Sequence, residues 1–140
     1  MSIVDPTGFA KPLPVPTPVS APFWAALNED RIELQRCGAC DAWIHYPRTR
    51  CPNCGSDRLG WHAVAGTGAI YTFTVARQAT APPFADEVPQ LLAVIELDEG
   101  VRLSTTLVGA APEDVAVGAT VTPVFDHVAD GVTLLRYRLA

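Results

Sequence analysis

The stretch Cys37-Gly38-Ala39-Cys40, followed after ten residues by Cys51-Pro52-Asn53-Cys54-Gly55, decides how the middle of this chain folds. Two Cys-x-x-Cys pairs form two tight turns whose thiolates converge on one ion, and four thiolates suit tetrahedral zinc. We therefore predict one Zn²⁺ held by Cys37, Cys40, Cys51 and Cys54. Because the protein fills all four positions, none is open for water, and the ion is expected to be structural.

Iron is the competing ion for these cysteines, because Cys-Pro-x-Cys-Gly also occurs in rubredoxin-like sites. Redox dithiol chemistry is disfavoured, since it needs one cysteine pair set against a helix N-terminus. All four cysteines of the chain lie in the two pairs, so none remains as a nucleophile.

The cysteine pattern also bears on location. Paired thiols that bind metal are typical of a reducing compartment. The chain has no apolar run of about 20 residues that would span a bilayer, and its first residues do not read as a signal peptide. We therefore predict a cytoplasmic protein.

The formal charge of −5 is spread unevenly along the 140 residues. Residues 1–30 carry −2 and residues 61–140 carry −5, whereas residues 31–60 carry +2, from five arginines against three acidic residues. A general nucleic-acid binder would carry a basic stripe, so this class is disfavoured. The sole lysine, Lys11, lies in a proline-rich tail, which argues against Schiff-base chemistry.

Residues 1–30 are predicted to form an extended arm followed by a short helix. Five prolines within residues 1–19 remove the amide donors that a helix or central strand needs. A disordered tail is the alternative for this arm. Ser20 is predicted to cap a helix over residues 21–29, with Phe23, Trp24 and Leu27 on one stripe that docks on the chain's own core or on a partner.

Residues 31–62 are predicted to form the zinc ribbon. Residues 31–36 alternate polar and apolar side chains, which predicts a strand with one solvent-exposed face. Residues 43–46 predict a second short strand, which Pro47 ends.

Residues 63–140 are predicted to form a five-stranded OB-fold barrel. The strands are rich in β-branched and apolar residues and are separated by turn residues, over residues 69–76, 91–97, 101–107, 120–126 and 133–139. A tight hairpin at residues 98–100 and a helical turn opening at Pro112 complete the Greek-key pattern. The loop over residues 77–90 is longer than barrel closure needs, and loops of this kind are often functional.

Few other residues in the sequence could carry chemistry. Gly66-Thr67-Gly68 looks like the start of a dinucleotide-binding loop, but no helix follows, so we interpret it as a bend into the first barrel strand. The three histidines, His45, His62 and His127, are interpreted as surface or satisfied side chains. Arg48 and Arg50 are solvated charges or contacts to a phosphorylated ligand or an acidic partner.

Several short pieces, in this order, resemble the zinc-ribbon/OB-fold family first catalogued as domain of unknown function thirty-five. The pieces are Pro22-Phe23-Trp24, Leu34-Gln35-Arg36-Cys37, Tyr46-Pro47-Arg48, Cys51-Pro52-Asn53-Cys54-Gly55-Ser56, Gly66-Thr67-Gly68, Leu97-Asp98-Glu99-Gly100-Val101-Arg102 and Val117-Gly118. Members of that family are accessory subunits of enzymes that act on acyl-CoA thioesters, with thiolases, thiolase-like lipid-transfer proteins or acyl-transferring synthases as partners. In some complexes the partner is an aldolase that cleaves steroid side chains.

The resemblance implies a non-catalytic accessory subunit that docks beside a thiolase-like or lipid-transfer-type enzyme and helps to hold an acyl-CoA. Contact with CoA or the partner is assigned to Arg48, Arg50, Phe23, Trp24 and Phe84. The alternatives are a single-stranded nucleic-acid-binding OB-fold module and a self-sufficient enzyme. The nucleic-acid alternative needs aromatic platforms on the second and third barrel strands, and residues 91–97 and 101–107 contain no aromatic residue.

Overall fold

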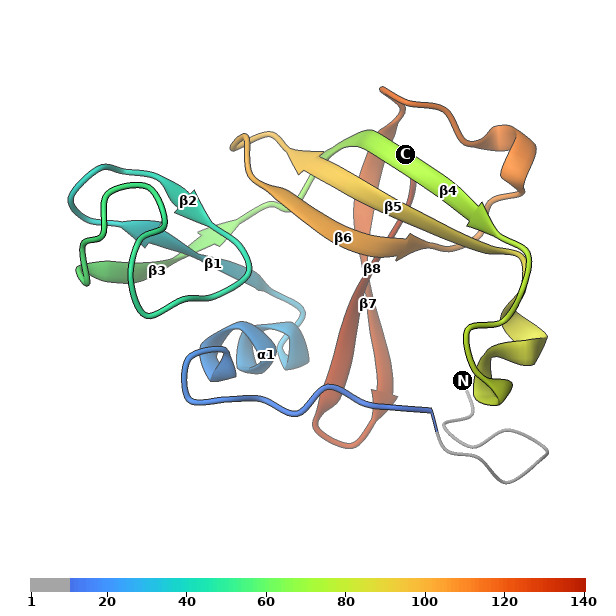
Figure 1. The fold of residues 1–140 in the computed structure, drawn as a ribbon, viewed down its shortest axis with the longest axis horizontal. Coiled ribbons are helices and arrows are strands. Elements are labelled where there is room, and N and C mark those ends of the chain that lie inside the picture. The colour runs from blue at the N-terminus through green and yellow to red at the C-terminus, as the bar shows by residue number, and fades with distance from the viewer. Residues whose placement is uncertain (1–10) are drawn as a thin grey trace.

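The computed structural model describes residues 11–140, which form a small three-stranded sheet and a short helix beside a larger barrel (Figure 1). The mainly β fold class predicted from the sequence is confirmed. The first part of the predicted arm, residues 1–10, lies outside the described residues. Within residues 11–140, no helix has the length and apolar character needed to cross a membrane.

Helix α1 (Ala21–Asn28) matches the predicted helix, but its start differs from the prediction. The Ser20 side chain makes no capping bond to the helix, because its backbone (φ −93°, ψ −10°) is already helical and not extended as a cap requires. Its hydroxyl instead accepts a hydrogen bond from the Thr17 amide at 2.9 Å. The helix ends where Asp30 takes a φ of +57°, and the Arg31 amide then reaches back to the Ala26 carbonyl at 3.0 Å.

The zinc-ribbon sheet contains β1 (Ile32–Cys37), β2 (Trp43–Ile44) and β3 (Leu59–Val64), in the order β2-β1-β3. β3 was not predicted, although it pairs antiparallel with the whole of β1, and β2 is shorter than the predicted strand at residues 43–46. β3 also continues to Val64, so the boundary at residue 62 between ribbon and barrel stays a prediction.

The predicted five-stranded OB-fold barrel is confirmed. Its five strands close in the order β4-β5-β6-β8-β7, and they are β4 (Gly68–Ala76), β5 (Gln90–Leu97), β6 (Arg102–Leu107), β7 (Thr120–Ala129) and β8 (Val132–Leu139). The predicted helical turn is η2 (Pro112–Asp114), and Gly100 takes a φ of +92° in the predicted hairpin. β6 and β8 pair in parallel only at Leu107 and Tyr137, so these two strands diverge toward the start of β6.

A buried hydroxyl of β8 fixes the segment that links the ribbon to the barrel. Tyr137, which is 0% exposed, donates to the Gly66 carbonyl at 2.6 Å, and burial raises the pKa of Tyr137 so that it remains a donor. Gly66 has a φ of +82°, and a Cβ there would overlap Ile32, while a Cβ at Gly68 would overlap the Glu96 carbonyl. The glycines are therefore a bend into the first barrel strand, as the sequence predicted.

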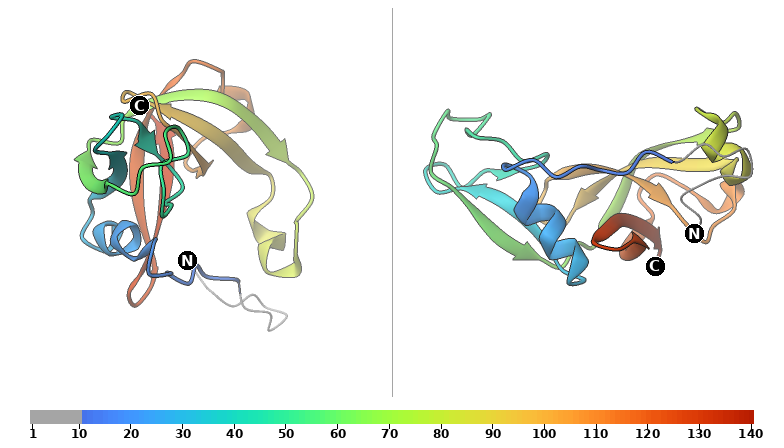
Figure 2. Two further views of the ribbon diagram at one scale, coloured as in Figure 1. Left: turned by 60° about the vertical axis from the view of Figure 1, so that its left-hand side comes forward. Right: turned by 90° about the horizontal axis from the view of Figure 1, so that it is seen from below.

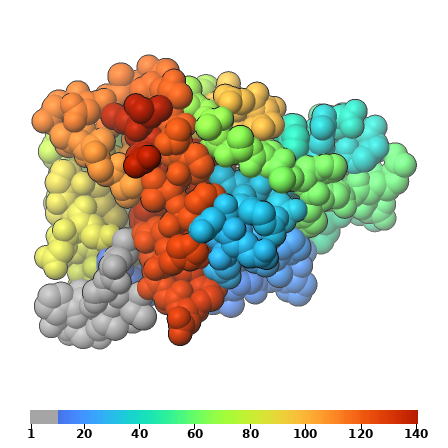
Figure 3. Space-filling view, turned by 180° about the vertical axis from the view of Figure 1, so that it is seen from behind, coloured from blue at the N-terminus to red at the C-terminus, as the bar shows by residue number. Residues whose placement is uncertain are grey.

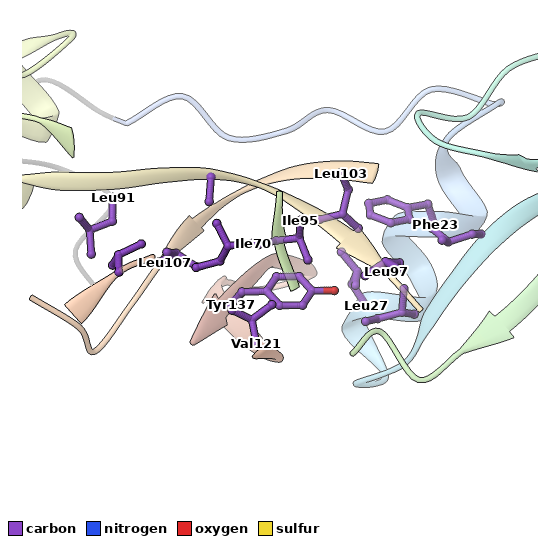
Figure 4. Packing of buried hydrophobic residues seen from close by; sticks show 14 residues of the cluster. Phe23, Leu27, Ile70, Leu91, Ile95, Leu97, Leu103, Leu107, Val121 and Tyr137 are labelled. Carbon is purple, nitrogen blue, oxygen red and sulfur yellow. The ribbon is translucent and has the colours of Figure 1, made fainter. Parts of the chain in front are cut away.

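One core runs through the barrel and under helix α1. In Figure 4, Phe23 and Leu27 from the helix point toward the barrel residues Ile95, Leu97 and Leu103. Seen from behind, the helix region packs directly beside the β7–β8 hairpin, and the ribbon projects at one end of the molecule (Figure 3). The apolar helical stripe thus serves largely the chain's own core.

The long loop between β4 and β5 contains a 3₁₀ segment, η1 (Pro82–Glu87), which meets the arm. Lys11 pairs with Glu87 at 2.7 Å and lies 5.8 Å from the centre of the Phe84 ring. Residues 11–17 have no regular secondary structure and run between this loop and helix α1 (Figure 2). The described part of the arm is thus fastened at both ends.

A polar network fastens the end of helix α1 to the β7–β8 hairpin. The Thr133 hydroxyl, in a residue that is 1% exposed, donates to Asn28 Oδ1 at 2.7 Å and lies 2.8 Å from Nδ1 of His127. Nε2 of His127 lies 2.7 Å from Asp30 Oδ1, and the Asn28 amide donates to the Gly131 carbonyl at 3.0 Å. Both nitrogens of His127 therefore have partners.

We predict that Thr133→Val lowers the free energy of unfolding by about 1–3 kcal/mol, because it removes the two hydrogen bonds that the buried Thr133 hydroxyl makes with Asn28 and His127. Urea unfolding followed by circular dichroism measures the change. Thr72→Val is the matched control, since Thr72 is exposed on β4, and it should stay within about 0.5 kcal/mol of the unmodified protein. Equal effects of the two variants would contradict a stabilising role for the network.

Candidate functional site

The four predicted cysteines come together at the tip of the ribbon. Their sulfur atoms all lie within 4.8 Å of one another, and the pairs Cys37–Cys54 and Cys40–Cys51 are each separated by 3.6 Å. Four sulfurs placed tetrahedrally at about 2.3 Å from zinc would lie about 3.8 Å apart. The spacing therefore fits a tetrahedral metal ion.

Backbone and side-chain amides in both turns point at the sulfurs. The amide of Ala39 donates to Cys37 Sγ at 3.3 Å, and the amide of Asn53 donates to Cys51 Sγ at 3.4 Å. The Asn53 side chain also donates to Cys40 Sγ at 3.5 Å, and this bond is the main reason why the pKa of Cys40 is lowered to about 6. These donors stabilise thiolates, which are the form that binds zinc.

The chemistry of this donor set is that of a structural zinc site. Cys37 and Cys51 are buried and form a small apolar cluster with Ile44, separate from the barrel core. Four thiolates complete the tetrahedron, so a bound zinc ion would hold the two turns together and supply no open coordination position. Its contribution is to folding.

The two candidate arginines of the ribbon, Arg48 and Arg50, make different contacts in the structure. Gln35 is 5% exposed, so the face of β1 that was expected to be solvated is closed here. Its side-chain amide donates to the Arg48 carbonyl at 2.9 Å and accepts from the Arg48 amide at 2.8 Å. This fixes the loop and leaves the Arg48 side chain exposed, whereas the Arg50 guanidinium donates back to the Gly55 carbonyl at 3.2 Å.

Phe23 and Trp24 form an aromatic cluster with two residues that the sequence analysis did not assign to a site, His45 and Tyr46. The Phe23 ring centre lies 5.1 Å from that of Trp24, 5.3 Å from that of His45 and 6.3 Å from that of Tyr46. The Trp24 indole donates to the Tyr46 hydroxyl at 3.2 Å. The cluster therefore joins the helix to the ribbon.

The fifth candidate, Phe84, lies apart from this cluster. It belongs to η1, beyond the barrel, where Lys11 lies over its ring. Phe84 and the cluster therefore belong to different surfaces.

Two adjoining hollows flank the aromatic cluster. The larger, of about 600 Å³, lies where β6 and β8 diverge, and its lining includes the four rings of the cluster, Ser104, Leu135 and Arg102. The smaller, of about 400 Å³, lies between the ribbon and the β5–β6 hairpin, and its lining includes Trp43, Arg48, Pro52 and Gly100. His45 and Arg102 line both hollows.

His45 is the most strongly perturbed histidine at this surface. Burial lowers its pKa to about 4, and its Nδ1 atom is buried with no hydrogen-bond partner among the described residues. The interpretation of His45 as a surface or satisfied side chain is therefore wrong, because the ring is largely buried and its Nδ1 has no partner. No sequence signal shows this, because the atoms that bury the ring come from helix α1, about twenty residues earlier.

The shifted pKa of His45 makes stability depend on pH. In the unfolded chain the ring takes up a proton near pH 6.5, whereas in the folded chain it stays neutral down to about pH 4. The unfolded state therefore binds more protons between these values, and the free energy of unfolding falls as the pH drops through this window.

We expect His45 to account for a loss of about 2 kcal/mol between about pH 7 and about pH 5. Urea unfolding of the protein and of His45→Phe at both pH values isolates this contribution, because the variant retains a ring but cannot titrate. If the two proteins lose the same stability, the histidine does not cause the dependence.

Two family models match the chain in tandem. The model described as the rubredoxin-like zinc ribbon domain of ChsH2 matches residues 24–60, which contain all four cysteines. The model described as the C-terminal OB-fold domain of ChsH2 matches residues 61–126.

Relatives fall into two groups by length. The chain is 43% identical over 102 residues to a probable enoyl-CoA hydratase alpha subunit from Thermomonospora curvata, in an alignment that covers 71% of this chain and 31% of that protein. It is 33% identical over 109 residues to a DUF35 domain-containing scaffold protein from Methanocaldococcus jannaschii, covering 74% of this chain and 76% of that protein. The chain thus spans only about a third of the hydratase subunit but most of the scaffold protein.

A solved structure matches nearly the whole chain. A chain of the Ltp2-ChsH2(DUF35) aldolase superposes with a TM-score of 0.80 and 36% sequence identity, covering 90% of this chain and 98% of that chain. The likeness includes both the ribbon and the barrel.

Proposed function

Because this chain belongs to the DUF35 family of zinc-ribbon and OB-fold proteins that includes ChsH2, we propose that it is a non-catalytic accessory subunit of an acyl-CoA-acting enzyme. It binds a lipid-transfer-type or thiolase-like partner, such as an aldolase acting on steroid side chains, and helps to hold that partner's acyl-CoA substrate. The thiol chemistry of the zinc site suits a reducing compartment, so we place the complex in the cytoplasm.

The observation that carries this proposal is the match to the chain in the Ltp2-ChsH2 aldolase. The match takes in 98% of that chain, so nearly all of its fold has a counterpart in this protein, which supports a similar place in a complex. The scaffold name of the archaeal relative supports the same role. The hydratase name belongs to a protein of which this chain matches only 31%, so we do not carry a hydratase activity over.

The chemistry of the described residues supports a non-catalytic role. The zinc tetrahedron is complete without water, and the cysteines are all used as its ligands. β5 and β6, the strands on which OB-folds carry stacking platforms for single-stranded nucleic acid, have no aromatic residue. No observation favours the nucleic-acid alternative.

Co-expression with a thiolase-like or lipid-transfer-type protein from the same organism tests the proposal. We expect the two chains to copurify as one complex of fixed stoichiometry, measured by size-exclusion chromatography with light scattering. The partner alone should be insoluble or poorly active on its acyl-CoA substrate, and activity should return when this chain is supplied. If no complex forms, and the partner's activity and solubility are the same alone, the accessory role is wrong.

A further inference from the structure

Strand β6 has one edge whose main-chain groups point away from its neighbour β5. The Leu97 amide donates to the Val101 carbonyl at 2.8 Å, and hydrogen-bonded pairs alternate with unbonded pairs along an antiparallel ladder. Every second residue of β6, counted from Leu103, therefore bonds to β5. The residues between them, Ser104 and Thr106, turn their amide and carbonyl groups to the other side, toward β8.

β8 closes only one end of this edge. β6 and β8 pair at Leu107 and Tyr137 and run at a steep angle to each other (Figure 1). The Val108 amide donates to the Tyr137 carbonyl at 2.8 Å, just past the end of β6. Within residues 11–140, no strand lies opposite Ser104 on that side. The opening between the two strands is the larger hollow of about 600 Å³, which Ser104 and Leu135 both line.

The open edge lacks the features that normally keep other strands away. Free edges in soluble proteins usually carry charges, a proline or a bulge. Residues 103–107 of β6 contain no charged residue and no proline, and the pairing of β6 with β5 is regular throughout. The two arginines that line the hollow, Arg102 and Arg136, each form an ion pair with an acidic residue of the barrel. The edge is therefore open to a strand and has no unbalanced charge beside it.

The outer face of the sheet next to this edge is uncharged as well. The solvent side of an antiparallel sheet is normally polar. Here the strand register sets uncharged side chains from β4, β5 and β6 in two rows, Thr72–Val94–Ser104 and Thr74–Leu92–Thr106. These residues line a further hollow of about 570 Å³. An uncharged face beside an unpaired edge is a surface that a bound strand and its side chains would cover.

We propose that β6 is the docking edge for an extended segment of the enzyme partner, which joins the barrel as an added strand opposite Ser104 and Thr106. Main-chain hydrogen bonds hold such a segment, and its alternate side chains meet the neighbouring surface. Its side chains are small or β-branched and uncharged, because the adjoining face offers threonine, valine and leucine. The existence of the partner rests on the proposed function.

The shape of the hollow favours a single segment over a second copy of this chain. Phe23 and Trp24 of helix α1 and His45 and Tyr46 of the ribbon form one wall of the hollow beside the edge. A second barrel approaching β6 would collide with this wall, whereas one extended segment fits between the wall and β8.

Hydrogen–deuterium exchange of the zinc-loaded chain tests the edge, read at single residues for the chain alone and in complex with the co-expressed thiolase-like or lipid-transfer-type protein. We expect the amides of Ser104 and Thr106 to exchange at least about tenfold more slowly in the complex, because each gains a hydrogen bond. The amides of Leu103 and Thr105 are the internal control. They are already bonded to β5, so their exchange should change much less.

Ser104→Pro tests the main-chain bond directly. Proline removes the Ser104 amide donor, which points away from β5, and proline is tolerated at a strand edge when the missing donor faces outward. Ser104→Ala is the matched control, because it keeps the amide and removes only the hydroxyl. Displacement of fluorescently labelled chain from the purified complex compares the two variants. We expect Ser104→Pro to bind at least about tenfold more weakly than the unmodified chain, and Ser104→Ala to stay within about twofold.

The outcomes separate this docking mode from the accessory role. If the complex forms but Ser104 and Thr106 exchange as fast as in the free chain, or if both Ser104 variants displace the labelled chain equally well, strand addition is wrong and the accessory role stands. If Ser104→Pro does not fold, the exchange of the unmodified complex decides alone. If no complex forms, the accessory role is wrong, and the docking mode is wrong with it.

Discussion

Replacing Cys37 with serine is expected to abolish zinc binding and to unfold the ribbon. A structural zinc ion of this kind contributes roughly 10–16 kcal/mol, far more than a module of this size gains from its own apolar contacts. Cys37 is 1% exposed and accepts the Ala39 amide, so a hydroxyl in its place would be a poor ligand in a buried position. Metal analysis should fall from one zinc per chain to below about one tenth.

Asn53→Ala provides the graded comparison for this prediction. Its side chain donates to Cys40 Sγ but is not itself a ligand, so its loss should weaken zinc binding about 10–100-fold without abolishing it. Competition with a chromophoric chelator measures both variants. A Cys37→Ser protein with full zinc content and an unchanged melting temperature would contradict the structural role of the metal.

Loss of the zinc ion should unfold the ribbon but destabilise the barrel only in part. The cluster around Cys37, Cys51 and Ile44 is separate from the barrel core, so the barrel can keep its own packing when the ribbon unfolds. β1 nevertheless places Ile32 and Leu34 in the barrel core, so its loss removes part of that core. We therefore expect the barrel to survive with a lower melting temperature.

The parts of the fold that could be predicted are those encoded by local spacing. The cysteine pairs predict the zinc site because ligand spacing is set within each turn. The barrel strands are predicted because runs of β-branched and apolar residues are separated by turn residues. β3 was missed because its residues, Leu59–Val64, are mostly half-buried or exposed and show no clear period. It becomes a strand only through its pairing with β1.

The four metal ligands of the candidate site could be predicted from the sequence, but the contacts of the residues around them could be predicted only in part. The sequence gives no reason to treat Arg48 and Arg50 differently. In the structure they differ, because the Gln35 side chain makes two hydrogen bonds with the backbone of Arg48. The approach of His45 to Phe23 likewise depends on how the ribbon packs against helix α1. Such contacts between distant segments leave no local pattern for sequence reasoning to use.

Leu27→Ala is expected to lower the free energy of unfolding by about 2–5 kcal/mol, the range for emptying a fully packed leucine site. Leu27 is 0% exposed and faces the barrel core, where Leu97 and Phe23 lie nearby (Figure 4). An eight-residue helix is not stable alone, so its docking depends on the side chains that it buries. Chemical denaturation of the zinc-loaded protein measures the change.

Val117→Ala is the control for this prediction, because Val117 is 66% exposed and its truncation should cost less than about 0.5 kcal/mol. The comparison also separates the two roles that the sequence left open for the apolar stripe of the helix. If Leu27→Ala leaves the isolated chain as stable as Val117→Ala but prevents binding of the partner, the stripe serves the partner. If it destabilises the isolated chain as expected, the helix belongs to the chain's own core, and within the aromatic cluster Trp24 and Tyr46 still offer exposed surface to a second protein.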